Sequence, residues 1–284
     1  MDVDTDRAGQ PVPVSPIIFK SPLPSSVKIV PVVFIVNDML RSNDTTQLKT
    51  LAAHIIRFVD AKIKQAGKRD YQELQVDCDW TAKTRDPYFF LLRQLSKTTS
   101  ARHQLLSATL RLHQLKNQQS SGIPPVGRVM LMCYNMGNLR KYGSQNSILE
   151  LSELKKYLGP DLTAYPLPED IGLPLFNWAV AFRNKAYIGL SKKLDITLLN
   201  DKNQFRFIGG NLYRAVNDLP QYGLLHGDEI RWESVAENEL NQVAKYISPF
   251  LKTDSLTVIY FHLDNDLIKA HPYAELEKTT ALFR

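Results

Sequence analysis

The sequence has few cysteines and no long apolar run. Only two of its 284 residues are cysteine, Cys78 and Cys133, and their spacing fits neither a metal site nor a disulfide framework. We expect both to be small buried hydrophobic residues. The longest apolar run, residues 29–36, is far too short to cross a bilayer. These absences exclude a disulfide-stabilised small domain, and they predict no membrane-spanning segment in this chain.

Several motifs that carry chemistry are also absent. The pair Gly209 and Gly210 has no predicted helix after it, so it is not a phosphate-binding loop. The chain has no Gly-x-Ser-x-Gly elbow, no histidine-rich zinc motif and no cysteine paired with an obvious histidine. Its 35 Lys and Arg residues outnumber 29 Asp and Glu, but the basic residues are scattered. We therefore expect no cofactor, no resident metal and no nucleic-acid partner.

What the chain does have is an alternation of apolar strands and amphipathic helices. Predicted strands, several of them continuous apolar runs typical of parallel sheets, cover residues 28–37, 73–80, 105–113, 126–135, 173–182 and 256–265. Predicted helices cover residues 45–65, 147–158 and 235–250, and two more begin near residues 87 and 273. Residues 183–234 are rich in Asn, Asp and Gly, which indicates a long loop excursion with room for a hairpin.

Strands that alternate with helices predict right-handed βαβ units in an α/β fold. Polar and aromatic residues follow strand after strand, which favours a closed (β/α)8 barrel of the TIM type over an open sheet. Six strands are clear and residues 2–4 resemble the tip of another, whereas a complete barrel has eight. We therefore predict one barrel domain over residues 1–284 that lacks its first strand and part of its second at the N-terminus. An export or lipoprotein signal would then lie upstream, so localisation stays open.

The predicted strand at residues 73–80 ends in an unusual group of side chains. Asp77 and Asp79 are two residues apart, so both lie on the same face of the strand. Two carboxylates crowded on an apolar strand are costly unless they are solvated, paired or used. They could serve as an acid/base pair, as nucleophile and acid, or as acceptors for sugar hydroxyls. Alternatively, they are structural partners of backbone amides, Arg111 or Tyr134.

Two short motifs are similar to those of a known family. Residues 77–81, Asp-Cys-Asp-Trp-Thr, resemble the D-x-D-W-E strand end of the family 18 glycoside hydrolases. Residues 132–135, Met-Cys-Tyr-Asn, resemble their later M-x-Y-D/N strand end. Together with VPVVFIVN and LRLHQ, in this order, the chain most resembles uncharacterised bacterial glycoside-hydrolase-like barrel proteins over roughly residues 1–270. The resemblance implies that a carbohydrate binds at the C-terminal face of the strands.

One position departs from the family pattern. Directly after D-x-D-W the hydrolases have the Glu that protonates the glycosidic oxygen, whereas this chain has Thr81, whose hydroxyl cannot serve as a general acid. Three interpretations remain. The first is a glycoside hydrolase with Asp79 as acid or base and Asp77 supporting its charge state. The second is a non-catalytic carbohydrate-binding protein on a degenerate barrel. The third is a metal-dependent hydrolase that uses His113, His262 and Asp264.

The residues expected to bind a substrate lie at or beside predicted strand ends. Aromatic rings would stack on a sugar, with Trp178 replacing the family's final-strand Trp, and polar side chains would orient its hydroxyl groups. The set is Trp80, Arg111, His113, Tyr134, Asn135, Asn177, Trp178, His262 and Asp264. We expect members of this set to line a single cleft together with Asp79. The partner would be a carbohydrate, and the protein a monomer.

Overall fold

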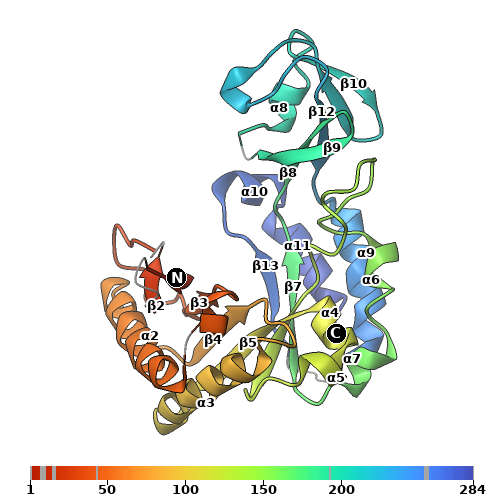
Figure 1. The fold of residues 1–284 in the computed structure, drawn as a ribbon. Helices are drawn as coiled ribbons and strands as arrows, with labels where there is room; N and C mark the ends of the chain where they lie inside the picture. Colours follow the sequence, from red (N-terminus) through yellow and green to blue (C-terminus); the bar gives the residue numbers. More distant parts are fainter. Residues whose placement is uncertain are drawn as a thin grey trace. The chain divides into compact units, whose positions relative to one another are not determined.

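The computed structural model describes residues 2–6, 11–14, 17–42, 44–191, 193–252 and 256–283. These residues form two compact units (Figure 1). The first comprises residues 1–132 and 164–170, and the second comprises residues 133–163 and 171–284. Within the described ranges, no helix combines the length and the apolar character that crossing a membrane would require.

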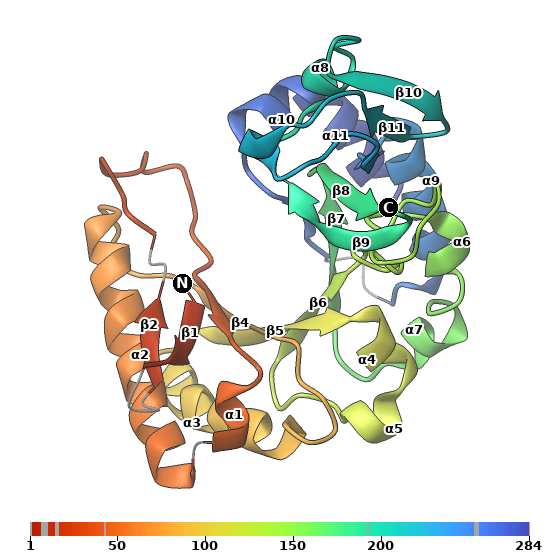
Figure 2. The same cartoon turned by 45° about the horizontal axis from the view of Figure 1, so that its top comes forward.

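The first unit is built on a sheet with the strand order β2-β1-β3-β4-β5-β6 (Figure 2). The strands are β1 (Asp2–Thr5), β2 (Pro11–Val14), β3 (Val32–Ile35), β4 (Glu73–Cys78), β5 (Leu105–Arg111) and β6 (Arg128–Met132). All neighbours are parallel except β1 and β2. The predicted parallel arrangement of the strands expected at residues 28–37, 73–80, 105–113 and 126–135 is therefore confirmed. Residues 2–4, which resembled a strand tip, belong to β1 and pair with β3.

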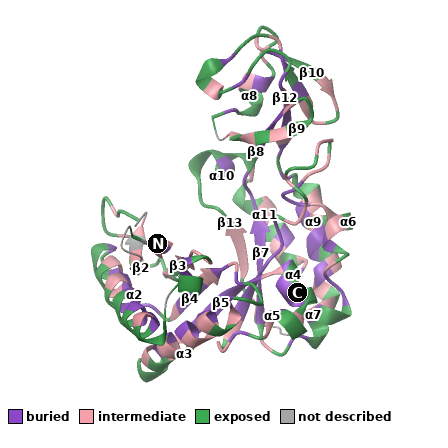
Figure 3. Cartoon of the chain, in the orientation of Figure 1, coloured by how far each residue is buried: buried purple, intermediate pink, exposed green. Residues whose placement is uncertain are grey.

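The helices of the first unit are α1 (Met39–Ser42), α2 (Thr45–Gln65), α3 (Arg85–Ala101), α4 (Leu112–Lys116) and α5 (Gln118–Ser121). The bounds of α2 are those predicted, and its cap is Asp44, whose carboxylate accepts from the amides of Thr46 and Gln47 at 2.8 Å each. One side of α2 is buried and the other is exposed (Figure 3). Helices α2 and α3 contact one another, and α3 packs on β5.

The parallel strands of the first unit have an apolar face and a more polar face. In β4, Leu74, Val76 and Cys78 are fully buried. The residues between them, Gln75 and Asp77, point to the opposite face because side chains alternate along a strand. Both cysteines of the chain are free and buried, as expected. The apolar side supplies the core, which leaves the other side of the sheet free to carry polar chemistry.

The second unit contains a parallel strand pair and a separate antiparallel sheet. Strand β7 (Glu169–Pro174), whose last four residues belong to this unit, pairs in parallel with β13 (Val258–Phe261). The antiparallel sheet has the order β10-β11-β12-β8-β9. Its strands are β8 (Trp178–Arg183), β9 (Ala186–Ser191), β10 (Phe205–Gly209), β11 (Leu212–Ala215) and β12 (Glu229–Glu233). The helices are α6 (Leu151–Leu154), α7 (Pro160–Ala164), α8 (Ile196–Leu199), α9 (Glu237–Ile247), α10 (Asn265–Ala270) and α11 (Tyr273–Ala281), with 3-10 turns at Pro220–Tyr222 and Ser248–Phe250.

Three sequence predictions about this unit are corrected. The predicted strand at residues 173–182 is two strands, because β7 ends at Pro174 and β8 begins at Trp178 in the antiparallel sheet. Residues 183–234 are not a loop excursion, since they contain β9 to β12 around a buried apolar cluster. The helix predicted at 147–158 is shortened to α6. The sequence of residues 173–182 is apolar apart from Asn177 and did not reveal the change of sheet. The short strands β9 to β12 lie between polar turns, so their composition is like that of a loop.

Candidate functional site

Two hydrogen-bonded pairs join the polar faces of β4 and β5. The Thr109 hydroxyl donates to Asp77 Oδ1 at 2.6 Å. The Arg111 guanidinium donates from Nε to Asp79 Oδ1 and from Nη2 to Asp79 Oδ2, the second at 2.7 Å. The predicted site residues Asp77, Asp79 and Arg111 are therefore brought together at the carboxyl ends of these strands. Thr109 was missed from sequence, although it lies two residues before Arg111 and shares its face.

The contact between Arg111 and Asp79 has the two-pronged geometry that makes arginine–carboxylate pairs strong. The side chain of Asp79 is 43% exposed and that of Arg111 is 22% exposed, so the pair lies at the surface of the sheet end. A carboxylate has about four lone-pair positions, and the guanidinium occupies two of them. Asp79 therefore keeps acceptor capacity for hydroxyl groups from solvent or a ligand, while its charge is matched by arginine.

Asp77 has a different environment from Asp79. Burial raises the pKa of Asp77, and the negative charge of Asp79 raises it further, whereas the Thr109 hydrogen bond and the Arg111 guanidinium oppose the shift. Desolvation is the largest of these effects and disfavours the charged carboxylate. The environment of Asp77 therefore favours its protonated form.

Thr81 occupies the position that follows this acidic strand end. Its amide donates to Thr84 Oγ1 at 2.9 Å, and the two hydroxyls are 3.3 Å apart. The fully buried Thr84 in turn donates to Asn37 Oδ1 at 2.5 Å. These contacts tie the end of β3 to the turn that starts α3. They hold a hydroxyl network where the hydrolase motif carries a carboxyl group.

Trp80 is a core residue, so its predicted sugar-stacking role is wrong. The side chain is 1% exposed, stacks on Tyr88 with ring centroids 5.1 Å apart, and donates from Nε1 to the carbonyl of Ser121 at 2.8 Å. The buried Gln114 donates to the Trp80 carbonyl at 3.1 Å and accepts from the Arg111 amide at 2.8 Å. Gln114 therefore ties the end of β4 to the start of α4, which the sequence pattern did not reveal.

His113 lies beyond the strand on which it was predicted. Strand β5 ends at Arg111, and His113 is an exposed residue of α4. Partial desolvation and the positive charge of Arg111 lower the pKa of His113, while Asp79 opposes the shift. The neutral imidazole is thereby favoured beside the Arg111–Asp79 pair.

In the second unit, predicted site residues gather in an aromatic cluster. Tyr134 stacks on Phe261 with ring centroids 5.5 Å apart and meets Phe176 edge-on at 5.9 Å. Phe176 also lies 5.1 Å from the ring of Trp178 and 6.4 Å from that of His262. Tyr134 is buried, Trp178 is partly exposed and His262 is exposed. Within this unit, three of the predicted residues thus share one aromatic surface.

The remaining predicted residues have simpler positions. Asn135 is exposed and has a positive φ of 54°, with its amide donating to the carbonyl of Ile148 at 2.9 Å. Asn177 is exposed between β7 and β8. Asp264 caps α10 by accepting from the amides of Asp266 and Leu267 at 2.9 and 3.3 Å. Among the described residues, no group of three His, Cys, Asp or Glu side chains could hold a metal ion. Asp264 acts as a helix cap, so its contacts do not support the metal-dependent interpretation.

The predicted convergence of all these residues in one cleft stays a prediction. Asp77, Asp79 and Arg111 belong to the first unit, whereas Tyr134 and Trp178 belong to the second. We therefore treat them as two surfaces: the acidic strand end, formed by Asp77, Asp79, Thr109 and Arg111, and the aromatic cluster around Phe176.

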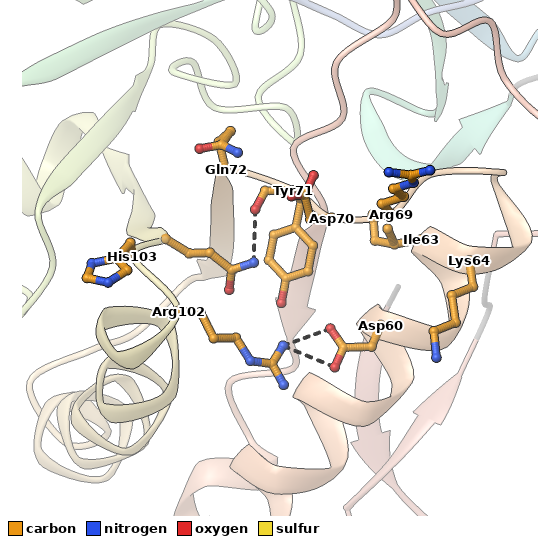
Figure 4. Close-up of a pocket in the computed structure, with 10 residues that line it drawn as sticks. Asp60, Ile63, Lys64, Arg69, Asp70, Tyr71, Gln72, Arg102 and His103 are labelled. Carbon is orange, nitrogen blue, oxygen red and sulfur yellow. Dashed lines mark hydrogen bonds and ion pairs between the residues drawn. The ribbon is translucent and has the colours of Figure 1, made fainter.

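The first unit also has a pocket of about 340 Å³ that is separate from the acidic strand end (Figure 4). Its lining residues come from α2 and from the segments that precede β4 and β5, at the amino ends of these strands. Within it, both oxygens of Asp60 accept from Arg102 Nη1 at 2.9 and 3.0 Å, and Gln104 donates to the Tyr71 carbonyl at 2.9 Å. Asp60 and Arg102 of this pocket therefore satisfy one another, and ligands of α/β folds bind at the opposite, carboxyl ends of the strands.

Comparison of the sequence with models of known protein families, and with curated proteins, finds no match. Solved structures do match. The chain is similar to the spore cortex-lytic enzyme SleL of Bacillus cereus, with a TM-score of 0.58 and 13% identity over 99% of this chain and 66% of that one. It is similar to SleL of Bacillus megaterium, with a TM-score of 0.53 and 13% identity over 90% of this chain and 60% of that one. It is also similar to the Group IV chitinase of Ostrinia furnacalis, with a TM-score of 0.52 and 10% identity over 90% of this chain and 80% of that one.

These likenesses confirm the predicted resemblance at the level of the fold. The chain has a mixed α/β architecture similar to that of SleL and of the chitinase. At 10–13% identity they concern the fold alone. What the chain does must be argued from its own residues.

Proposed function

We propose that this protein binds a carbohydrate at the acidic strand end and does so without cleaving it. The observation that carries the proposal is the paired state of Asp79. Both of its oxygens accept from Arg111, and position 81 offers a threonine hydroxyl bonded to Thr84. A strand end with an arginine-matched carboxylate, and with no carboxyl group at position 81, is suited to binding rather than to protonating a leaving group from that position.

The chemistry of the acidic strand end fits sugar hydroxyl groups. A hydroxyl both donates and accepts, so it can donate to the open positions of Asp79 and accept from the guanidinium of Arg111. Arg111 Nη1 has no hydrogen-bond partner among the described residues, which leaves donors for a ligand oxygen. Hydrogen bonds to charged groups are worth about 1.5–3 kcal/mol each. The similar structures include a chitinase and a spore cortex-lytic enzyme, which suggests oligomers of N-acetylated sugars as the first ligands to try.

The aromatic cluster supports the same class of ligand independently. Trp178 is partly exposed and packs beside Phe176, so its ring can offer a flat apolar surface. Exposed aromatic rings suit the apolar faces of sugar rings, because they bury large area at low entropic cost. Asn177 directly precedes Trp178, and the ring of His262 lies 6.4 Å from that of Phe176. Both residues are exposed, and we propose that they contact ligand hydroxyl groups. We also propose that the parallel strands form part of a TIM-type barrel, as the likeness in fold suggests.

A second candidate function is glycoside hydrolysis through Asp77. One observation favours it, namely that burial raises the pKa of Asp77 and so favours the protonated acid that a leaving group needs. In this case Asp77 would act as the acid, and Asp79, held by Arg111, would supply negative charge. The two candidates differ in whether any product forms.

The proposal is tested by titrating soluble N-acetylglucosamine oligomers against the wild type and Asp79→Asn. Asparagine keeps the shape and one acceptor but loses the charge, so affinity should fall about 10- to 100-fold. Asp60→Asn is the matched control, because Asp60 also accepts from an arginine through both oxygens but lies at the opposite ends of the strands. Equal affinities of wild type and Asp79→Asn would refute the proposed site, and an equal loss in Asp60→Asn would point to a general effect of charge.

A further inference from the structure

The second unit contains a fully buried carboxylate at the end of β12. The side chain of Glu233 is 0% exposed. Its Oε2 accepts from the Ser147 amide at 2.9 Å, from the Ser147 hydroxyl at 2.5 Å and from Trp178 Nε1 at 2.8 Å. Its Oε1 accepts from Arg231 Nε at 2.5 Å. Four donors surround one carboxylate, which is the degree of pairing that a buried charge requires.

Arg231 extends this network to a neighbouring backbone segment. Its side chain is 0% exposed and lies over the ring of Phe182, with 5.1 Å from Cζ to the ring centroid. Nη1 donates to the carbonyls of Lys141 and Gly143 at 2.6 and 3.2 Å, and Nη2 donates to that of Leu139 at 2.9 Å. The arginine therefore fixes the course of residues 139–143.

The network joins two segments that carry candidate ligand contacts. Residues 139–147 follow Tyr134 and Asn135 along the chain, and Trp178 directly follows Asn177. Because the Trp178 N–H is bonded to the buried Glu233, the indole plane has one orientation and its partly exposed ring cannot turn freely. Hydrogen bonds are directional, so the bond to Glu233 constrains the indole plane more than apolar contacts would.

From this geometry we infer that Glu233 is the positioning residue for Trp178, holding the indole in the orientation in which its exposed face stacks on a sugar ring. The inference rests on the proposed function and deepens it by assigning a role to a residue outside both candidate surfaces. A mobile side chain loses conformational freedom when a ligand immobilises it, at a cost of about 0.5–1.5 kcal/mol. A ring that is already held in place avoids this cost. Loss of Glu233 should therefore weaken sugar binding by about two- to tenfold.

The test is a double-mutant comparison with N-acetylglucosamine oligomers as the probe. Glu233→Gln should weaken binding about two- to tenfold in the wild type but have no effect in a Trp178→Phe background, where the indole donor is gone. The matched control is Glu229→Gln on the same strand, since Glu229 pairs with the half-exposed Arg214 at 2.7 Å and lies opposite Phe182 rather than Trp178. The control should bind like the wild type. An equal effect of Glu233→Gln in both backgrounds would overturn the inference.

A second readout needs no ligand. The ¹⁵N–¹H resonance of the Trp178 indole should shift in Glu233→Gln and stay in place in Glu229→Gln, because only the first changes the acceptor of this N–H. If Glu233→Gln does not fold, Trp178→Phe tests the link from the other side, and affinity equal to wild type would overturn it. A shifted resonance with unchanged affinity would also overturn the positioning role while leaving the acidic strand end intact. No binding by the wild type would instead refute the proposed function, and with it any role in sugar binding.

Discussion

Removal of Arg231 gives the most demanding prediction about stability. Arg231→Met would leave the carboxylate of Glu233 buried without its cation, although three donors from Ser147 and Trp178 would remain. Breaking one side of a buried ion pair costs about 3–5 kcal/mol. Because the remaining donors still solvate Glu233, we expect a loss of about 3 kcal/mol in the free energy of unfolding. Glu233→Gln, which strands the arginine instead, should cost about 2–3 kcal/mol since three carbonyls still accept from it.

The double variant separates pairing from packing. The double variant Arg231→Met, Glu233→Gln has no buried charge at this pair. Its loss in the free energy of unfolding should therefore be about 2–3 kcal/mol smaller than the sum of the two single losses. Urea unfolding of the four proteins measures this coupling, and the same cycle on Arg214 and Glu229 is the control. In that pair the arginine is 51% exposed and the glutamate 12%, so water screens one partner, and the expected coupling is about 1 kcal/mol. A double-variant loss that equals the sum of the two single losses to within about 0.5 kcal/mol would refute an energetic coupling between Arg231 and Glu233.

Three further predictions concern single residues. Burial raises the pKa of Asp77, so the folded protein binds more protons than the unfolded chain. As pH rises from the unfolded-state pKa of about 4 through the folded-state pKa, this carboxyl group therefore lowers the free energy of unfolding. Asp77→Asn, which keeps an acceptor for Thr109, should therefore melt higher than wild type at neutral pH, and a pH-independent difference would contradict this. Trp80→Ala should lose about 3–5 kcal/mol in urea unfolding, because the ring is buried, and a loss under 1 kcal/mol would contradict a core role. Asp264→Ala should lower the free energy of unfolding by about 1 kcal/mol, because Asp264 caps α10. If Asp264 instead belonged to a metal site, the melting temperature of the wild type would depend on added zinc.

The parts of the fold that repeat a simple pattern could be predicted from sequence. The capped helix α2, with Asp44 before a regular apolar stripe, has the predicted bounds. The continuous apolar runs also gave the parallel order of β3, β4, β5 and β6. In these elements local preference and tertiary packing agree, so the pattern of burial is already visible in the sequence.

The antiparallel sheet of the second unit could not be predicted in this way. Its strands β9 to β12 are four to six residues long, and the burial of β9 alternates between exposed and intermediate. Such strands bury little by themselves and are stabilised by pairing that no local pattern reveals. Trp80 illustrates the same limit within the site. An aromatic residue at a strand end suits a sugar platform or a core equally well, and only its neighbours Tyr88 and Ser121 decide for the core.

The part of the site that depends on the alternation of side chains along a strand could be predicted from the sequence. Placing Asp77 and Asp79 on one face needs only the period of a strand, and Arg111 was expected beside them on the next strand. Thr109 and Gln114 were missed because Thr and Gln at such positions are as common in structural as in functional roles. Glu233 lies on a short strand inside the region expected to be loop, so no sequence signal tied it to Trp178.

The central claim is that the acidic strand end binds a carbohydrate without cleaving it. Its most direct test is a titration of the wild-type protein with N-acetylglucosamine oligomers of increasing length, with the same samples analysed for released sugar. We expect saturable binding that Asp79→Asn weakens about 10- to 100-fold, and we expect the oligomers to be recovered intact. Release of shorter oligomers by the wild type, abolished in Asp77→Asn, would contradict it and establish hydrolysis through Asp77.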